Sequence, residues 1–136
     1  MKTVVIGADS FCGQYIFGFC NTISSAFGTS FVNSKSGVFS RIDIRSRPEL
    51  HKYLSQINPN IIIHTAGLSD IDFCESNPLS SHETSVNGTQ NIVDWCISNR
   101  CRLIYISTDY IFDGVNGNYD ELATPSPVNV YPLCLY

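Results

Sequence analysis

The sequence predicts an α/β fold built on a doubly wound parallel sheet, and three observations support this prediction. Short β-branched or apolar runs begin near residues 3, 29, 61 and 103. Segments with helical periodicity separate these runs, and a glycine turn follows the first run directly. Alternating strands and helices favour parallel pairing with right-handed crossovers and helices on both faces. With 136 residues and 43% hydrophobic content, the chain is most simply one domain, 1–136.

The first third of the chain predicts four elements. Thr3–Ile6 is a strand that stops at Gly7, and a helix with apolar residues at 11, 15, 16, 19, 20 and 23 follows it. Gly28 fits a helix C-cap, so we expect Thr29–Val32 to be the second strand. The alternating segment Arg41–Arg45 predicts a short extended piece.

The second half repeats this alternation. Pro48 opens an amphipathic helix that ends at 58–60, and Ile61–Ile63 is the most strand-like run in the chain. Asn77 followed by Pro78 marks another helix start. That helix should turn residues 86, 92, 93, 96 and 97 towards the core and end near residue 100. Leu103–Ile106 predicts a strand covered on both faces, and 115–130 predicts a loop.

The composition excludes several classes of partner. The formal charge is -4 with only eight Lys and Arg residues, so binding to nucleic acid or to an anionic membrane is not expected. Binding of a single phosphate-bearing ligand stays open, because a helix N-terminus binds such a group without net positive charge. The five-residue apolar stretch near the N-terminus is too short for a signal sequence or a membrane span. We therefore expect a cytoplasmic protein.

The cysteines and histidines predict no metal site. Six cysteines are scattered singly without a C-x-x-C motif, and the three histidines share no ligand spacing with them. We expect small buried thiols in a reducing compartment.

A glycine loop is the first candidate binding element. The segment from Gly7 to Gly13 lies between the first strand and the first helix, where a dinucleotide fingerprint would lie. Gly7 permits the tight turn, Gly13 permits close helix–strand packing, and Ser10 stands where a further glycine would let the backbone approach the pyrophosphate. The cofactor-binding candidates here are Gly7, Ser10, Phe11, Cys12 and Gly13. An ordinary glycine turn is the alternative.

The tip of the expected second strand suggests which dinucleotide is bound. It lacks the Asp or Glu that would hold a ribose diol, whereas Ser34 and Lys35 suit a 2′-phosphate. NADP(H) is therefore the preferred cofactor and NAD(H) is the alternative, although Lys35 taken alone is equally well a solvated loop residue. Asp43 and the adjacent Ile44 are candidates for the adenine end, and Asp43 could instead be a surface charge.

Two further strand ends carry candidate residues. Thr65, Ala66 and Gly67 are small residues in a tight turn, as a chain needs when it passes close to a flat ligand. His64, just before them, is interpreted as a hydrogen-bonded strand-end residue rather than a catalytic one. After the strand that begins at residue 103, polar side chains appear abruptly at Ser107, Thr108, Asp109 and Tyr110, as expected where a parallel strand opens into a ligand crevice.

The chain resembles the extended short-chain dehydrogenase/reductases, most closely the dTDP-4-dehydrorhamnose reductase family. The likeness covers nearly all 136 residues and is most specific in NIIIHTAG (60–67), DFCE (72–75), NGT (87–89), STDYIFDG (107–114) and PSPVNVY (125–131). It implies a Rossmann-like fold and NADPH-dependent reduction of a nucleotide-linked 4-keto-6-deoxy sugar. By this resemblance Thr108 hydrogen-bonds the substrate carbonyl and Tyr131 donates a proton, with Ser107, Asp109 and Tyr110 on the substrate side.

One departure from the family pattern bears on activity. The family has a lysine four residues after its tyrosine, where this chain has Leu135. A tyrosine without that lysine is a poor acid-base group at neutral pH, so we expect turnover to fall by orders of magnitude. The family also continues into further strands and a lobe that binds the sugar nucleotide. The fold is therefore expected to be incomplete, and our hypothesis for residues 132–136 is a frameshift or a truncated gene model.

Two other functions stay open beside the reductase. The regulatory β-subunits of methionine adenosyltransferase resemble the same fold, share a similar IYIS-DY-FDG segment, and bind NADP without turnover. An inactive fragment with residual nucleotide binding is the third hypothesis. A sheet edge left without its later strands favours association, so a homodimer is also expected to be accessible.

Overall fold

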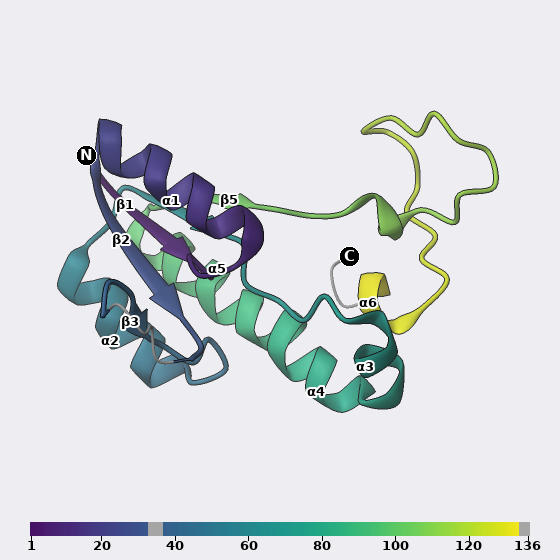
Figure 1. Ribbon diagram of the computed structural model, residues 1–136, viewed down its shortest axis with the longest axis horizontal. Coiled ribbons are helices and arrows are strands. Elements are labelled where there is room, and N and C mark those ends of the chain that lie inside the picture. The colour runs from purple at the N-terminus through teal and green to yellow at the C-terminus, as the bar shows by residue number, and fades with distance from the viewer. Residues whose placement is uncertain (33–36, 134–136) are drawn as a thin grey trace.

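The computed structural model describes residues 1–32 and 37–133, and in them five parallel strands form one sheet. The strand order is β3-β2-β1-β4-β5 (Figure 1). The strands are β1 (Lys2–Ile6), β2 (Ser25–Ser30), β3 (Ser40–Arg41), β4 (Ile61–His64) and β5 (Arg102–Tyr105). The order reverses between β1 and β4, and ligands of doubly wound sheets bind at this point, beyond the carboxyl ends of the strands. The predicted α/β class and parallel pairing are confirmed.

Six α-helices, one π-helical turn and one 3₁₀ turn accompany the sheet in the described residues. They are α1 (Phe11–Ile23), α2 (Arg47–Ile57), α3 (Ile71–Ser76), α4 (Pro78–His82), η1 (Glu83–Asn87), α5 (Gly88–Asn99), η2 (Asp109–Ile111) and α6 (Val130–Leu133). The predicted helix from Pro78 is real but passes through the π-helical turn η1 before it continues as α5. None of the described helices has the length and apolar character needed to cross a membrane.

Helices α2 and α5 cover one face of the sheet and α1 lies on the other (Figure 1). The core lies under α2 and α5, because β-branched side chains from the central strands meet the apolar stripes of both helices there. Its buried members are Val4, Ile6, Ile42, Ile44, Leu50, Leu54, Ile57, Ile62, Ile92, Trp95 and Cys96. The Trp95 indole donates to the Ser55 hydroxyl at 3.2 Å, so its polar edge is satisfied where the two helices meet.

The prediction for the second strand was wrong in its boundaries. Gly28 is not a helix cap: α1 ends at Ile23, and Gly28 is a buried residue inside β2. A Cβ at position 28 would lie 2.5 Å from the Phe39 ring and 2.9 Å from the Ala8 Cβ. The glycine therefore gives space for packing on the sheet, a role that a turn signal in the sequence conceals.

The predicted burial of β5 on both faces was wrong, and the apolar residues of α1 are also largely exposed. The apolar residues of α1 at 11, 15, 19 and 23 are 61–78% exposed, and Gly13 and Cys20 are the buried ones. In β5, Ile104 is 43% exposed, and Ile106 just after the strand is 42% exposed. The cause is coverage: α1 packs on β1 and β2 and leaves the same face of β4 and β5 open. On the other side of the molecule, Ile97 of α5 is likewise exposed.

The chain beyond β5 leaves the sheet and forms an extended loop (Figure 1). Asp113 organises this loop by accepting hydrogen bonds from the Tyr119 hydroxyl, from the Ser126 hydroxyl at 3.0 Å and from the Val115 N–H at 2.9 Å. These donors hold the pKa of Asp113 below its ordinary value, the Tyr119 bond contributing most. The loop returns to α3, where the Glu75 carboxylate accepts the Val130 N–H at 2.6 Å at the start of α6.

Candidate functional site

A cavity of about 410 Å³ opens at the carboxyl ends of β1, β2 and β4, at the point where the strand order reverses. Its size lies in the range of small-molecule and cofactor sites. Residues from the sheet edge line it together with residues of α3 and α4: Ile6, Gly7, Asp9, Ser10, Thr29, Ser30, Phe31, Ile42, Asp43, Ile44, Arg45, Thr65, Ala66, Gly67, Leu68, Phe73, Ser80 and Thr84.

The floor of the cavity is a close crossing of two turns. Gly7 has φ +82°, and a Cβ on it would lie 2.7 Å from the Ala66 backbone nitrogen. The Thr65 hydroxyl donates to the carbonyl oxygens of Ile6 at 2.9 Å and Gly7 at 3.0 Å, which ties the turn after β4 to the turn after β1. The two turns are fixed at a separation that no side chain at residue 7 would permit.

Ser10 caps the helix that starts at the cavity. Its hydroxyl oxygen accepts the Gly13 N–H at 3.0 Å and lies 3.3 Å from the Thr65 hydroxyl. The Ser10 backbone is extended, at φ −68° and ψ 164°, so this position does not need a glycine. Since the first backbone bond of α1 runs from Gln14 to Ser10, the amides of Phe11 and Cys12 lack intrahelical acceptors. The N-terminus of α1 is thus suited to a phosphate.

His64 is structural, as the sequence indicated. It is fully buried, its Nε2 is 3.0 Å from the Thr89 hydroxyl, and its ring stacks on Tyr105 at 5.1 Å. Burial lowers the pKa of His64 to about 4, because the charged imidazolium would be removed from water. The ring is therefore neutral at pH 7 and braces β4 against α5.

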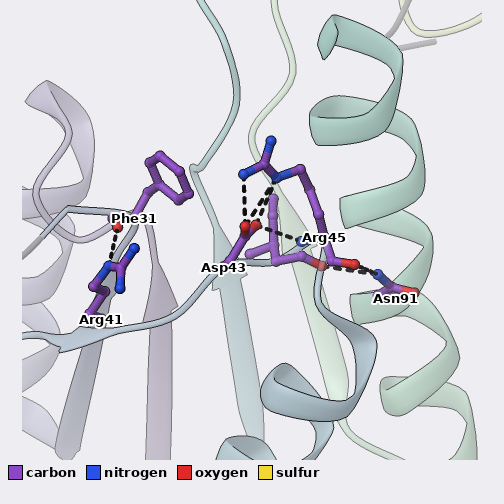
Figure 2. Close-up of polar contacts among 6 residues, drawn as sticks. Phe31, Arg41, Asp43, Arg45 and Asn91 are labelled. Carbon is purple, nitrogen blue, oxygen red and sulfur yellow. Dashed lines mark hydrogen bonds and ion pairs between the residues drawn. The ribbon is translucent and has the colours of Figure 1, made fainter. Parts of the chain in front are cut away.

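Asp43 and Arg45 form an ion pair at the outer rim of the cavity (Figure 2). The Arg45 Nε donates to Asp43 Oδ1 at 2.9 Å and Nη2 donates to Oδ2 at 2.7 Å. These bonds lower the pKa of Asp43. The guanidinium also lies 5.2 Å from the centre of the Phe31 ring, a cation–π distance.

This rim is anchored to α5. The Asn91 amide donates to the Ile44 carbonyl at 2.9 Å and to the Arg45 carbonyl at 3.4 Å (Figure 2). The Ile44 side chain packs where a Cβ on Gly88 would stand, 2.7 Å from its Cδ1. The rim thus has a fixed backbone, and Arg45 presents a cation and a flat surface there.

A second carboxylate lies at the tip of β2. Ser30, the last residue of β2, donates its hydroxyl hydrogen to Asp9 Oδ2 at 2.6 Å. Ser30 is 2% exposed, whereas Asp9 is exposed, and both line the cavity. The loop after β1 therefore delivers an acid to a strand end whose own sequence lacks one.

The structure brings together seven of the cofactor-binding residues predicted from the sequence. The residues that line the cavity are Gly7, Ser10, Asp43, Ile44, Thr65, Ala66 and Gly67. Phe11, Cys12 and Gly13 do not line it; they form the first turn of α1 beside it. Ser34 and Lys35 lie outside the described residues, so the predicted 2′-phosphate contact stays a prediction.

The predicted catalytic residues form a separate group. Thr108 caps η2, its hydroxyl accepting the Tyr110 N–H at 3.3 Å and lying 3.3 Å from Asp109 Oδ1. Tyr131, in α6, meets the Tyr110 ring edge-on at 6.1 Å. Tyr110 therefore links the strand-end segment to Tyr131, but neither Thr108 nor Tyr131 lines the cavity. Leu135 lies outside the described residues.

The described part of the chain offers no metal site. No group of three or more His, Cys, Asp or Glu side chains gathers among residues 1–32 and 37–133. The five cysteines described there are free thiols: Cys20, Cys74 and Cys96 are buried, Cys101 is half-buried and Cys12 is exposed.

The family follows from a match to nearly the whole chain. The family model of the RmlD substrate binding domain matches residues 1–135. The chain belongs to this family. The β-subunit of methionine adenosyltransferase 2 from Rattus norvegicus is 28% identical over 131 residues, which are 96% of this chain and 39% of that protein.

Solved structures of family members share the fold. A hypothetical dTDP-4-dehydrorhamnose reductase from Sulfolobus tokodaii superposes with a TM-score of 0.92 and 27% identity, covering 99% of this chain and 49% of its own. The reductase from Bacillus anthracis, solved in complex with NADP, gives a TM-score of 0.89 and 25% identity, covering 99% and 46%. The chain therefore has a Rossmann-like fold, and it spans about one third to one half of the length of the proteins that it matches.

Sequence reasoning missed eleven residues of the cavity lining, and four of them make the polar and cation–π contacts described above: Asp9, Ser30, Phe31 and Arg45. Asp9 was visible inside the glycine loop, and Ser30 follows that loop by about twenty residues, the spacing at which a ribose-binding residue is expected. Their hydrogen bond depends on the register of β1 against β2, which the sequence pattern misplaced. Arg45 had only its spacing of two residues from Asp43 as a signal.

Proposed function

We propose that this chain is the cofactor-binding part of a reductase that acts on a nucleotide-linked 4-keto-6-deoxy sugar, in the manner of dTDP-4-dehydrorhamnose reductase. The observation that carries the proposal is the cavity at the β1/β4 switch point, with the Gly7 turn, the N-terminus of α1 and the Asp43–Arg45 pair on its walls. These are the features that a dinucleotide requires: close backbone approach, donors for phosphate and a polar adenine end.

The residues present fit a nicotinamide dinucleotide. The N-terminus of α1 would hold the pyrophosphate, the Asp43–Arg45 rim would hold the adenine, and the Thr65–Gly67 turn would border the nicotinamide half. NADP(H) is preferred and NAD(H) is the alternative. The bound NADP of the Bacillus anthracis relative supports this preference, as do Ser34 and Lys35 in the sequence.

The bound nicotinamide would supply hydride, and this chain would supply the polar groups of the reaction. Thr108 hydrogen-bonds the sugar carbonyl and Tyr131 donates the proton to its oxygen, so that an alcohol results. Ser107, Asp109 and Tyr110 face the substrate. Leu135 stands where the family has its lysine, so this chain lacks the charge of that residue, and we expect correspondingly low turnover.

Calorimetric titration with NADPH and NADH, followed by an assay of NADPH oxidation with dTDP-4-dehydrorhamnose, tests the proposal. We expect weak cofactor binding and little turnover in the chain as it is. Leu135→Lys, in a chain extended by a relative's substrate lobe, should raise turnover, and adding Tyr131→Phe should abolish it. Tyr15→Phe, which changes an exposed tyrosine of α1, is the matched control. Absence of binding of both dinucleotides would overturn the proposal.

A noncatalytic regulatory subunit is the second candidate. The similarity to the methionine adenosyltransferase β-subunit extends over 96% of this chain, and Leu135 is compatible with a role without turnover. Affinity purification of the tagged chain with a methionine adenosyltransferase catalytic subunit distinguishes the two functions. A stable complex together with dinucleotide binding that the Leu135→Lys variant cannot convert to turnover would favour the regulatory role.

A further inference from the structure

The tip of β2 is where a doubly wound fold distinguishes a free ribose from a phosphorylated one. An acidic side chain at the end of the second strand accepts hydrogen bonds from the ribose 2′-hydroxyl, and a cation there accommodates a 2′-phosphate. In this chain the strand ends with Ser30, which is neutral. The strand-end residue alone therefore predicts neither choice.

The structure supplies the missing acid from another loop. Asp9 Oδ2 accepts the Ser30 hydroxyl hydrogen at 2.6 Å, while the Asp9 side chain is exposed on the cavity wall. A buried serine thus holds a solvent-facing carboxylate beside the end of β2. Asp9 occupies the position in space, though not in sequence, of a ribose-binding acid.

The other charges that line the cavity do not neutralise Asp9. Asp43 and Arg45 are the other charged residues in its lining, and three side-chain hydrogen bonds at 2.9, 3.1 and 2.7 Å pair them with each other. Among the described residues the lining therefore carries a formal charge of −1, located at Asp9. A 2′-phosphate adds one to two negative charges there, whereas a ribose diol adds none and can donate hydrogen bonds.

We propose that Asp9, held by Ser30, is the residue that sets ribose selectivity: its carboxylate binds the adenosine ribose diol and disfavours a 2′-phosphate. This inference rests on the proposed dinucleotide binding. The chain then discriminates only weakly between the two dinucleotides, and it binds NADP(H) less than about tenfold more tightly than NAD(H). Asp9 is a binding and specificity residue and takes no part in proton or hydride transfer.

Titration calorimetry of the full chain with NADPH and with NADH tests the inference. We expect Asp9→Asn to shift the ratio of the two dissociation constants towards NADPH by about tenfold, by removing the charge and keeping the shape. Ser30→Ala should shift the ratio in the same direction by a smaller factor, because the carboxylate remains but loses its anchor. Glu121→Gln, the same charge change on an exposed loop residue, is the matched control and should leave the ratio unchanged.

The outcomes separate the two proposals. If the variants fold, as judged by circular dichroism, and the ratio for Asp9→Asn stays within twofold of the parent, the assignment of Asp9 is overturned while dinucleotide binding stands. An equal shift in Glu121→Gln would also overturn it, because the effect would then be one of net charge. If neither dinucleotide binds the parent chain or any variant, the proposed function fails, and the role of Asp9 fails with it.

Discussion

A Cβ added to Gly13 would lie 2.1 Å from the carbonyl oxygen of Gly7 and 2.7 Å from the Ser10 hydroxyl. The first turn of α1 is therefore in direct contact with the turn that follows β1. Because the nearest atom is a backbone carbonyl oxygen, a methyl group at residue 13 cannot be accommodated by a change of side-chain rotamer.

Gly13→Ala should therefore destabilise the protein by about 3 kcal/mol or more, in the range of severe steric mutations. It should also weaken dinucleotide binding, since α1 must shift away from the cavity. Urea denaturation measures the first effect and calorimetric titration the second.

Gly18→Ala is the matched control: this glycine lies in the same helix with nothing within 4 Å of the added Cβ. It should stabilise the helix by about 0.5–1 kcal/mol, and equal behaviour of the two variants would contradict the steric argument.

Arg100 ends α5 in the left-handed conformation, at φ 54°. The Cys101 N–H donates to the Cys96 carbonyl at 3.0 Å and the Arg100 N–H to the Ile97 carbonyl at 3.4 Å, which is the Schellman pattern that glycine usually ends. Arg100→Gly should raise the free energy of unfolding by about 0.5–1 kcal/mol, because glycine adopts positive φ without steric cost. Arg100→Ala retains the cost and should bring no gain; a gain of equal size in both variants would assign the effect to the lost charge.

The buried, neutral His64 should make the folded protein less stable in mild acid. Its pKa is about 4 in the folded protein and about 6.5 in an unfolded chain, so the unfolded state binds more protons between these values. The free energy of unfolding therefore falls as the pH drops from 6.5 towards 4, with a slope of at most about 1.4 kcal/mol per pH unit.

His64→Gln removes this proton uptake and keeps an amide that can bond Thr89. Urea denaturation of both proteins at pH 7 and pH 5 is the measurement. The parent should lose about 2 kcal/mol more than the variant over this interval. Parallel losses in the two proteins would show that the buried imidazole is not the group responsible.

The open face of β4 and β5 predicts self-association. Ile104 is 43% exposed beside apolar residues of α1, and β5 is one of the two edge strands of the described sheet. Ile104→Thr keeps a β-branched residue in the strand and should reduce association while costing less than about 1 kcal/mol of stability. Sedimentation velocity at several concentrations measures the effect and shows whether the associated species is the expected homodimer.

The control variant is Ile62→Thr, on the buried face of the neighbouring strand. It should instead lower the free energy of unfolding by about 2–4 kcal/mol. An unchanged sedimentation profile in Ile104→Thr would argue against this face.

Much of the fold could be read from the chain because local signals agree with it. The first, third and fourth predicted strands, the Gly7 turn and the helix from Pro48 lie within a residue or so of their predicted places. The boundaries of β2 could not be read, because Gly28 resembles a turn residue until Phe39 and Ala8 are placed beside it. The exposed side of α1 could not be read either, since helical periodicity shows which residues share a face but not whether another element covers that face.

The sequence by itself determined the α/β class, the glycine turn and seven of the cavity residues, because these depend on periodicity and on backbone conformations that few residue types adopt. Only the tertiary structure decided the charge pattern of the site. Asp9 meets Ser30 across 21 residues, and Asn91 fixes the Asp43–Arg45 rim from a helix 46 to 47 residues away. Such pairs depend on strand register and on helix packing, which are settled by contacts between segments distant along the chain.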